Sequence, residues 1–530
     1  MGSSFDLAHT LASVATGFSE KAQDRDSRPA SIILPPHKSC LMNMPLPIRF
    51  PRRSFLQHNA MGLGSVALAW MMQQDAARAI PPVIKQKPVT DLKLRVPQSQ
   101  PQARAMISLF QHGGPSHIDL TDPKPELTKF SGTDYPGDVE FSFVNQASKQ
   151  LLGSPFRFRQ HGECGTEISE LLPHLAGIVD DICLIRSMHT GANGHEVSIR
   201  YFHGGIPGVL GRPHLASWLL YALGSETQDL PAYMVLTDPG GHPVDGVNNW
   251  SNGFMPPLFQ GTVLRPKEPR ILNLAAPSHL KGTLQQQNLA FLQKLNTRHL
   301  EQQGGDADLE ARIASYELAA RMQTAATEAL DIRQETQATQ SLYGLDNDAT
   351  REYGTRCLIA RRLVERGVRF VQLFLGGQPW DNHGSIRTAL PAVCQRVDQP
   401  AAALVKDLRQ RGMLDSTIVH WGGEIGRLPV TQVMGDSAAA GRDHNGQGFS
   451  IWMAGGGIKG GMTYGSTDEF GHRAIENMVS PNDYQATLMS LFGLDHSQVI
   501  YHHNGQPQVI TANRPAKVVT DILKSSTVSQ

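Results

Sequence analysis

The stretch RFVQLFLGGQPWDNHG, from Arg369 to Gly384, joins an apolar segment to a glycine-rich loop that carries polar side chains. Residues 369–375 form the short apolar run that is typical of a buried β-strand. Asp381 and His383 follow in the loop. Ligands bind beyond the carboxyl ends of the strands in open α/β sheets. The stretch therefore predicts a buried strand with functional side chains at its end.

The same pattern recurs along the chain. Short apolar runs predict further strands at 104–110, 182–185, 232–236, 417–420 and 449–453. Helical spacing of apolar residues predicts helices at 167–180, 349–366, 388–411 and 481–492. Buried strands that alternate with helices indicate an α/β fold, a three-layer sandwich whose mostly parallel central sheet is covered on both faces.

The composition is that of a folded protein and gives no support to nucleic-acid binding. Of 530 residues, 40% are hydrophobic and 18% are charged, which is ordinary for a globular chain. The formal net charge is +0 at pH 7, whereas wrapping nucleic acid requires a concentrated basic surface. None of the cysteines has CxxC spacing, so neither a zinc knuckle nor a thioredoxin-like redox site is expected.

An export signal is predicted near the N-terminus. The arginine pair at 52–53 precedes an apolar run at 60–72 and a small-residue segment at 76–79. Together they predict a twin-arginine signal peptide over 44–79, with an amphipathic N-terminal helix as the alternative. The apolar run is shorter than the about 20 residues that cross a bilayer, so no stable membrane span is expected. We therefore expect the twin-arginine (Tat) export machinery as a partner and a periplasmic or extracellular location.

The remaining segments are distinguished by composition. Residues 1–43 lie ahead of the signal peptide and are expected to be disordered or to precede the true start. A proline-rich, extended lead-in is predicted at 80–103. The α/β domain is predicted at 104–510, with a helical insertion at about 283–340 that is rich in Ala, Gln and Glu, and a C-terminal tail at 511–530.

Several glycine-flanked loops present an imidazole or a carboxylate next to a predicted strand. We predict that five of these side chains hold a divalent metal, namely His112, Asp381, His383, Glu424 and His444. Mixed nitrogen and oxygen ligands suit Zn²⁺, Mn²⁺ or Fe, whereas Ca²⁺, which stays a candidate, and Mg²⁺ are less suited to imidazole. The alternative is a cluster of hydrogen-bonded loop residues without a metal.

Specific motifs accompany these residues. They are the arginine pair, GGPSHIDLTDPKPEL at Gly113–Leu127, WDNHG at Trp380–Gly384, GGEIGR at Gly422–Arg427, GRDHNGQGFSIWMAGGGIKGG at Gly441–Gly461, and the segment from Asn482 to Asp495. Together they resemble domain of unknown function 1501, an exported, sulfatase-like family of the alkaline phosphatase superfamily, over nearly all of residues 52–503. The resemblance implies an alkaline phosphatase/sulfatase-like fold with a metal-dependent active site.

The resemblance also implies a correspondence of loops. His112 stands at the end of the first strand, where relatives usually carry Asp, and Thr190–Gly204 corresponds to the loop that bears the nucleophile. Asp381 and His383 match a conserved pair of the superfamily, and Glu424 and His444 match further ligands. Ile425 stands where the superfamily has a metal-binding His, so one metal site is better preserved than a second.

The implied activity is hydrolysis of phosphate or sulfate esters, including esters of polysaccharides. The predicted catalytic residues are Ser116, His195 and Arg427, and the predicted substrate-binding residues are Arg442 and Asn445. Ser116 would be the nucleophile, with Ser198 or metal-bound water as alternatives, and His195 would be a general acid or base. The arginines would hold the anionic oxygens of the ester through forked hydrogen bonds.

A competing hypothesis is an exported binding or structural protein that retains the fold without turnover. Ile425 and the lack of an unmistakable nucleophile favour this hypothesis, whereas Asp381, His383 and His444 favour the enzyme. A metallopeptidase is disfavoured, because the His195-Glu196 pair lacks the second His of H-E-x-x-H.

Overall fold

The computed structural model describes residues 89, 91–142, 148–274, 282–302, 307–432 and 438–525. The chain separates into two compact units, Met1–Gln86 and Lys87–Gln530. The first unit lies outside the described residues, and with it lie the predicted signal peptide and the segment ahead of it. The fold is that of the second unit.

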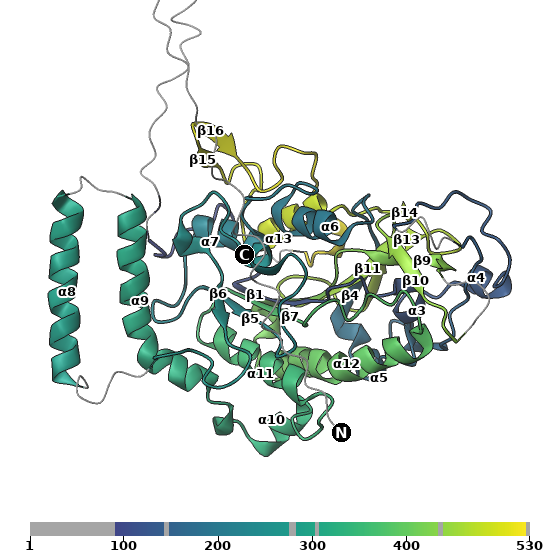
Figure 1. Ribbon diagram of the computed structural model, residues 1–530, viewed down its shortest axis with the longest axis horizontal. Coiled ribbons are helices and arrows are strands. Elements are labelled where there is room, and N and C mark those ends of the chain that lie inside the picture. The colour runs from purple at the N-terminus through teal and green to yellow at the C-terminus, as the bar shows by residue number, and fades with distance from the viewer. Residues whose placement is uncertain are drawn as a thin grey trace, which may run out of the picture. The chain divides into compact units, whose positions relative to one another are not determined.

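An eight-stranded sheet forms the centre of this unit. Its strands are β1 (Ala105–Phe110), β4 (Ile182–Met188), β5 (Tyr233–Leu236), β6 (Thr262–Leu264), β7 (Phe370–Phe374), β8 (Thr417–Gly422), β11 (Phe449–Ala454) and β12 (Met462–Tyr464). They lie in the order β12-β4-β11-β8-β1-β7-β5-β6 (Figure 1). Adjacent strands are parallel except at β11, which is antiparallel to both β4 and β8. The predicted α/β class with a mostly parallel sheet is confirmed.

The reversed direction of β11 brings a further loop to the edge where the other strands end. Parallel strands share an edge at their carboxyl ends, whereas an antiparallel strand presents its amino end there. The short strand β10 (Arg442–Asn445) comes just before β11 and pairs with β9 (Gly426–Thr431), which follows β8. The segments that follow β8 and precede β11 are therefore neighbours at this edge.

Helices cover both faces of the sheet. Figure 1 shows them in two layers, with α11 (Arg351–Glu365) and α12 (Ile386–Gln410) on one face and α6 (His195–Gly204), α7 (Leu215–Leu223) and α13 (Pro481–Leu491) on the other. Leu109 of β1 belongs to the hydrophobic cluster under α11 and α12, and its neighbour Phe110 belongs to the cluster under α6 and α13. This follows because successive side chains of a strand point to opposite faces.

The local sequence explains why helix α13 begins at Pro481. The Ser480 hydroxyl oxygen accepts a hydrogen bond from the Asp483 backbone N–H, and the Asp483 carboxylate accepts one from the Ser480 N–H. This reciprocal capping box satisfies two N–H groups that the helix itself cannot pair. Pro481 occupies the first turn, where its missing N–H costs nothing.

Further helices and strands complete the unit. The remaining helices are α3 (His117–Leu120), α4 (Pro125–Lys129), α5 (Pro173–Ala176), α8 (Thr283–Gln302), α9 (Ala307–Leu330) and α10 (Gln337–Leu342). The remaining strands are β2 (Phe158–His161), β3 (Thr166–Ser169), β13 (Ser466–Thr467), β14 (Ala474–Glu476), β15 (Tyr501–His503) and β16 (Gln506–Gln508). No helix in the described part of the chain combines the length and apolar character needed to cross a membrane.

The prediction of a helix over 167–180 is wrong. Strand β3 occupies the start of this segment and pairs with β2, and the short helix α5 begins only at Pro173. Pro173 stands in the first turn of α5, where the missing N–H of a proline costs nothing, and this favours a helix start at that residue. Leu172 and Leu175 are nevertheless buried, so the apolar pattern indicated burial rather than helical periodicity.

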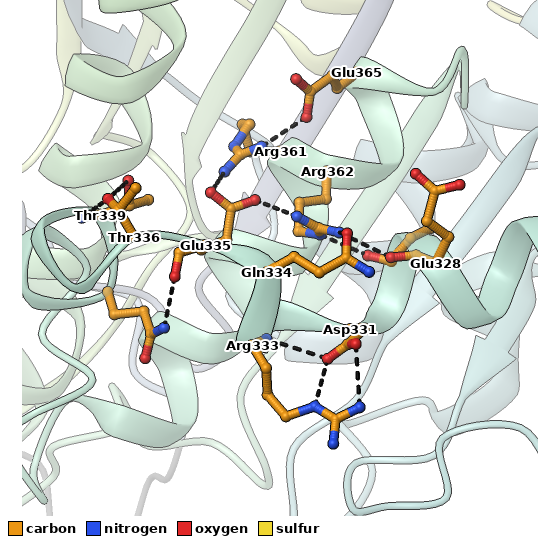
Figure 2. A network of polar contacts seen from close by, with 12 residues as sticks. Glu328, Asp331, Arg333, Gln334, Glu335, Thr336, Thr339, Arg361, Arg362 and Glu365 are labelled. Carbon is orange, nitrogen blue, oxygen red and sulfur yellow. Dashed lines mark hydrogen bonds and ion pairs between the residues drawn. The ribbon is translucent and has the colours of Figure 1, made fainter.

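The helical region at 282–342 is tied to the core by buried ion pairs. Figure 2 shows Glu335, which lies between α9 and α10, beside Arg361 and Arg362 of α11. Arg361 lies 2.7 Å from Glu335 and 2.9 Å from Asp407 of α12. By contrast, α8 has no buried residue and makes its main contacts with α9. The region is thus fixed at its carboxyl end, close to the core helices.

Candidate metal centre

Four side chains from three separate loops meet at the edge where β4, β7 and β8 end. His195 begins α6 after β4, Asp381 and His383 lie in the loop after β7, and His444 lies on β10. Their positions depend on close backbone packing. A Cβ atom on Gly113, in the loop after β1, would lie 2.8 Å from the Asp381 backbone nitrogen, so only glycine allows the two loops to pack this closely.

The Asp381 carboxylate is the centre of the group. Its Oδ1 lies 2.8 Å from His383 Nε2 and 3.1 Å from His444 Nε2. Its Oδ2 lies 3.5 Å from His195 Nε2. All three imidazoles therefore present the same ring nitrogen, Nε2, to one carboxylate.

The other ring nitrogen of each imidazole faces an oxygen acceptor. His195 Nδ1 lies 2.6 Å from Glu424 Oε1, and His444 Nδ1 lies 2.8 Å from the Asn193 carbonyl oxygen. His383 Nδ1 contacts the Gln432 side-chain oxygen. Metal-binding histidines are held in this way, because a hydrogen on Nδ1 that is donated to an oxygen leaves the Nε2 lone pair for the cation.

The geometry fits a divalent cation. His383 Nε2 and His444 Nε2 are 3.1 Å apart, so with Asp381 Oδ1 they form a triangle whose other edges are 2.8 and 3.1 Å. Zinc binds imidazole nitrogen at 2.0–2.1 Å, which places neighbouring ligand atoms of a tetrahedral ion about 3.3 Å apart. Ligand atoms of His195, Asp381 and His444, and separately of His383, Asp443 and His444, also lie within 4.8 Å of one another.

Burial and hydrogen bonding have opposite effects on the pKa values of two residues in this cluster, His195 and Asp381. Burial lowers the pKa of His195, but its hydrogen bonds to Asp381 and Glu424 outweigh this effect and raise the pKa to about 9. Burial raises the pKa of Asp381, yet the hydrogen bonds from the three imidazoles hold it far below its usual range. Asp381 and His383 retain 18% and 27% of their side-chain exposure, so solvent and small ligands reach the cluster from their side.

Arg427 positions Asp381. Its guanidinium donates to Asp381 Oδ1 at 2.6 Å, to the Gly114 carbonyl at 3.0 Å and to the Gly113 carbonyl. It also donates to the Arg442 carbonyl, and its side chain is 1% exposed. Because its donors are engaged within the protein, Arg427 orients the loop after β1 and the carboxylate.

Glu424 and His112, both predicted as metal ligands, lie behind the cluster. Glu424 Oε1 accepts hydrogen bonds from His195 Nδ1 and from the Gly113 N–H, at 2.6 and 3.1 Å. Both ring nitrogens of His112 are buried, and burial lowers its pKa to about 4, against the opposing effects of the Glu424 charge and the Asn249 side chain. The structure thus brings Glu424 against His195 and gives His112 no direct contact with Asp381 among the polar contacts described.

Ser116 and Arg442 belong to a different arrangement. The Ser116 hydroxyl and the Arg442 guanidinium both donate to the Asp119 carboxylate, with Arg442 Nε 2.7 Å from Asp119 Oδ2. Asp119 and Arg442 are completely buried, so this ion pair joins α3 to β10 inside the protein. The predicted nucleophile and the predicted substrate-binding arginine therefore lie together, and their contacts are to Asp119 rather than to Asp381.

The two remaining candidate side chains, Asn445 and Ser198, hold the backbone of nearby loops in place. Asn445 is buried, and its amide donates to the His472 carbonyl at 2.8 Å while its side-chain oxygen accepts the Gln447 N–H at 3.0 Å. Ser198, the alternative nucleophile, donates to the Ala192 carbonyl at 2.8 Å. Both side chains hold the backbone that carries His195 and His444.

Sequence reasoning overlooked three residues that support the cluster, namely Asn193, Gln432 and Asp443. Asp443 directly precedes His444, and its carboxylate accepts the His444 N–H at 2.7 Å. This adjacency in the segment GRDHNG was a signal that could have been used. Asn193 acts through its backbone carbonyl, which no residue type can indicate.

A family model described as "Protein of unknown function (DUF1501)" matches residues 103–523. The chain belongs to this family. The match runs from just before β1 to the segment where Val519 and Ile522 pack into the hydrophobic cluster under α6 and α13. This DUF1501 protein has no match among curated proteins.

Solved structures with distant similarity include a sulfatase and an alkaline phosphatase. Ps i-CgsB in complex with k-i-k-neocarrahexaose is 11% identical, with 74% of this chain and 73% of that chain covered and a TM-score of 0.34. The PsFucS1 sulfatase from Pseudoalteromonas sp. is 10% identical, with 74% and 68% covered and a TM-score of 0.31. Alkaline phosphatase from the Antarctic bacterium TAB5 is 9% identical, with 68% and 95% covered and a TM-score of 0.26.

Proposed function

We propose that this DUF1501 protein is an exported, metal-dependent hydrolase of phosphate or sulfate esters. The observation that supports it is the convergence of three imidazole Nε2 atoms on Asp381, with each Nδ1 directed to an oxygen. Asp381, His383 and His444 would hold the cation, which is Zn²⁺ or Mn²⁺ by ligand type, with Ca²⁺ a weaker candidate. A bound divalent cation polarises an ester oxygen and lowers the pKa of water.

His195 is the residue that would move a proton. Its Nε2 is buried and lies 3.5 Å from Asp381 Oδ2. Its Nδ1 lies 2.6 Å from Glu424 Oε1, which orients the ring and stabilises its protonated form. The protonated ring is therefore suited to donate a proton from Nε2 to the leaving group, as a general acid.

Water is the nucleophile that fits this arrangement. The hydroxyl groups of Ser116 and Ser198 are engaged with Asp119 and with the Ala192 carbonyl, away from the described contacts of Asp381. Recognition of the anionic ester would then fall to a bound cation, since the donors of Arg427 are engaged with the protein. A polysaccharide ester remains the substrate class suggested by the family resemblance.

A second candidate is a cation-binding protein without turnover. The engagement of Ser116, Ser198 and Arg427 with other protein groups favours this candidate, because these are the nucleophiles and the anion-binding arginine that the sequence predicted. It would retain the same cation ligands. The two candidates therefore differ only in the chemistry that follows binding.

Assays of the mature protein separate them. We would purify it without chelator, measure bound metals, and assay aryl phosphate, sulfate and phosphonate esters before chelation and after adding back Zn²⁺, Mn²⁺ or Ca²⁺. Metal-dependent turnover that is lost in His195→Gln, with bound metal retained, supports the hydrolase. Bound metal without turnover of any ester supports the second candidate, and a folded protein without metal contradicts both. His502→Ala, an exposed histidine on β15, is the control.

A further inference from the structure

Part of the connection between α4 and β2 packs beside β9, close to the loops that carry the candidate metal centre. Val139 and Phe141 are partly buried and pack against a hydrophobic cluster that includes Leu428 and Val430 of β9. Alternate side chains of this stretch thus anchor it to the protein, which leaves its backbone groups free to bind neighbouring loops. We call residues 139–142 the docked segment.

The docked segment binds the residue that precedes His444. The Ser142 backbone N–H donates to Asp443 Oδ2 at 2.9 Å. The Asp443 side chain is 1% exposed, and its Oδ1 accepts the His444 backbone N–H at 2.7 Å. One oxygen of this buried carboxylate therefore binds the docked segment, while the other binds the backbone of a proposed cation ligand.

The docked segment also binds Asn193, whose backbone carbonyl orients the His444 ring. Asn193 Nδ2 donates to the Glu140 carbonyl at 2.9 Å, and Asn193 Oδ1 accepts the Gly446 N–H at 2.7 Å. The Asn193 carbonyl accepts a hydrogen bond from His444 Nδ1 at 2.8 Å. Because both ends of the amide are bonded, the side chain of Asn193 fixes the direction of the carbonyl that holds His444.

The same connection contacts β9 again before β2 begins, next to the residue that orients His383. The Thr431 N–H donates to the Gln150 carbonyl at 2.9 Å. Gln432 follows Thr431 directly, and its side-chain oxygen contacts His383 Nδ1. Both imidazoles that face Asp381 from neighbouring loops are therefore oriented by groups that this connection supports.

We propose that docking of residues 139–142 and cation binding at the candidate metal centre are coupled, with Ser142 and Asn193 as positioning residues. The coupling rests on the proposed function. In the docked state Asp443 and the Asn193 carbonyl hold His444 with its Nε2 toward the cation. Undocking removes the Ser142 donor from a buried carboxylate and releases the Asn193 side chain, so the imidazole loses both restraints.

The attachment of the docked segment is light enough to respond to a cation. Val139, Phe141 and Ser142 are each only partly buried. Segments with few buried apolar contacts and partly exposed hydrogen bonds open locally at low free energy, while the core stays folded. Coupling between two binding equilibria is reciprocal. A segment whose docking strengthens cation binding is therefore itself stabilised by the cation, by the same factor.

Two proline variants test the effect of docking on cation affinity. Ser142→Pro removes the N–H that binds Asp443, because proline has no backbone donor. Asp138→Pro is the matched control, at an exposed residue of the same connection. Titration of the chelated full-length protein with Zn²⁺ and, separately, with Mn²⁺ should show roughly 10–100-fold weaker binding in Ser142→Pro, as for loss of an outer partner. Equal affinities in the two variants would overturn the coupling.

Hydrogen exchange tests the reciprocal effect, which a merely structural role does not predict. In the unsubstituted protein, we expect the Ser142 amide to exchange more slowly with Zn²⁺ bound than after chelation, since the cation favours the docked state. The exchange rate at Asp138 should stay unchanged. An exchange rate at Ser142 that is indifferent to the cation would contradict the proposal.

A further variant covers the case in which Ser142→Pro does not fold. Asn193→Asp still accepts the Gly446 N–H but has no donor for the Glu140 carbonyl. We expect weaker Zn²⁺ binding and faster exchange at Ser142 than in Asn504→Asp, which alters the turn between β15 and β16. Equal Zn²⁺ affinities in these two variants would refute the coupling alone. If the unsubstituted protein binds no cation, the proposed function fails and the coupling fails with it.

Discussion

His383 Nε2 lies 3.1 Å from His444 Nε2, and each ring directs its Nδ1 toward an oxygen acceptor. When both rings are neutral and donate through Nδ1, two lone pairs face each other across this distance. A cation between the two nitrogens and Asp381 Oδ1 converts that repulsion into ligation. The pair is therefore the most direct sign of a metal site in this structure.

The first prediction concerns this pair. His383→Ala should remove bound metal, because it deletes one of the three ligand atoms at the vertices of the triangle. The loss of affinity should exceed the about 10–100-fold change expected for an outer residue. Metal analysis and calorimetric titration of the chelated protein measure it, with His502→Ala as the control. Full retention of metal in His383→Ala would exclude this residue as a ligand.

A second prediction concerns Glu424, which was predicted as a ligand and lies behind His195. Glu424→Gln keeps an oxygen for His195 Nδ1 but removes the charge that holds this imidazole in place. We expect cation affinity to fall by roughly 10–100-fold while the stoichiometry at saturation is unchanged. Complete loss of the site in titrations would instead assign Glu424 to direct ligation.

The third prediction concerns the buried pair of Asp119 and Arg442. Asp119→Asn leaves the Arg442 guanidinium buried without its counter-charge, which should lower the free energy of unfolding by about 3–5 kcal/mol. A double variant, Asp119→Leu with Arg442→Met, should recover part of this loss because no charge remains buried. Urea unfolding measures both. A substrate-binding role for Arg442 predicts instead a selective rise in KM with little loss of stability.

The fourth prediction is a stability change at acid pH. Burial lowers the pKa of His214 and of His420 from 6.5 to about 3. Below pH 6.5 the unfolded chain binds a proton at each position that the folded chain does not, so the free energy of unfolding falls as the pH drops toward 3. Each histidine contributes a slope of about 1.4 kcal/mol per pH unit.

His214→Asn should remove one of these two contributions. Unfolding free energies of the chelated variant, measured from neutral pH down to about pH 5, should fall less steeply than those of the unsubstituted protein by about one proton. In metal-bound protein, protons would compete with the metal for its ligands as the pH falls. The comparison is therefore made with chelated protein. An identical slope would mean that His214 is protonated in the folded state.

The fifth prediction concerns export. Arg52→Lys combined with Arg53→Lys keeps both charges but removes the arginine pair that the twin-arginine route requires. We expect the protein to stay in the cytoplasmic fraction of a bacterial host. Arg25→Lys with Arg28→Lys, in the segment ahead of the predicted signal, should leave export unchanged. Equal export of both double variants would contradict the predicted signal peptide.

The sequence alone was sufficient for the fold class and for most of the core elements. The predicted strand at 369–375 is β7 at Phe370–Phe374, and the predicted helix at 388–411 is α12 at Ile386–Gln410. In each of these segments the buried apolar side chains follow the pattern of a strand alone or of a helix alone. The sequence pattern was therefore enough to identify the element. The segment 167–180 also buries its apolar residues, but Pro173 divides it, and the periodicity was misleading.

The sequence by itself determined which loops carry imidazoles and carboxylates, because glycine-flanked polar residues beside apolar runs are visible without coordinates. Only the tertiary structure decided which of them meet. The reversed β11 brings His444 to the edge where β7 presents Asp381, and the Asn193 carbonyl and Glu424 orient the rings. The direction of β11 and the position of the Asn193 carbonyl depend on packing between segments that are far apart in the sequence. The residue types of one segment do not determine such packing.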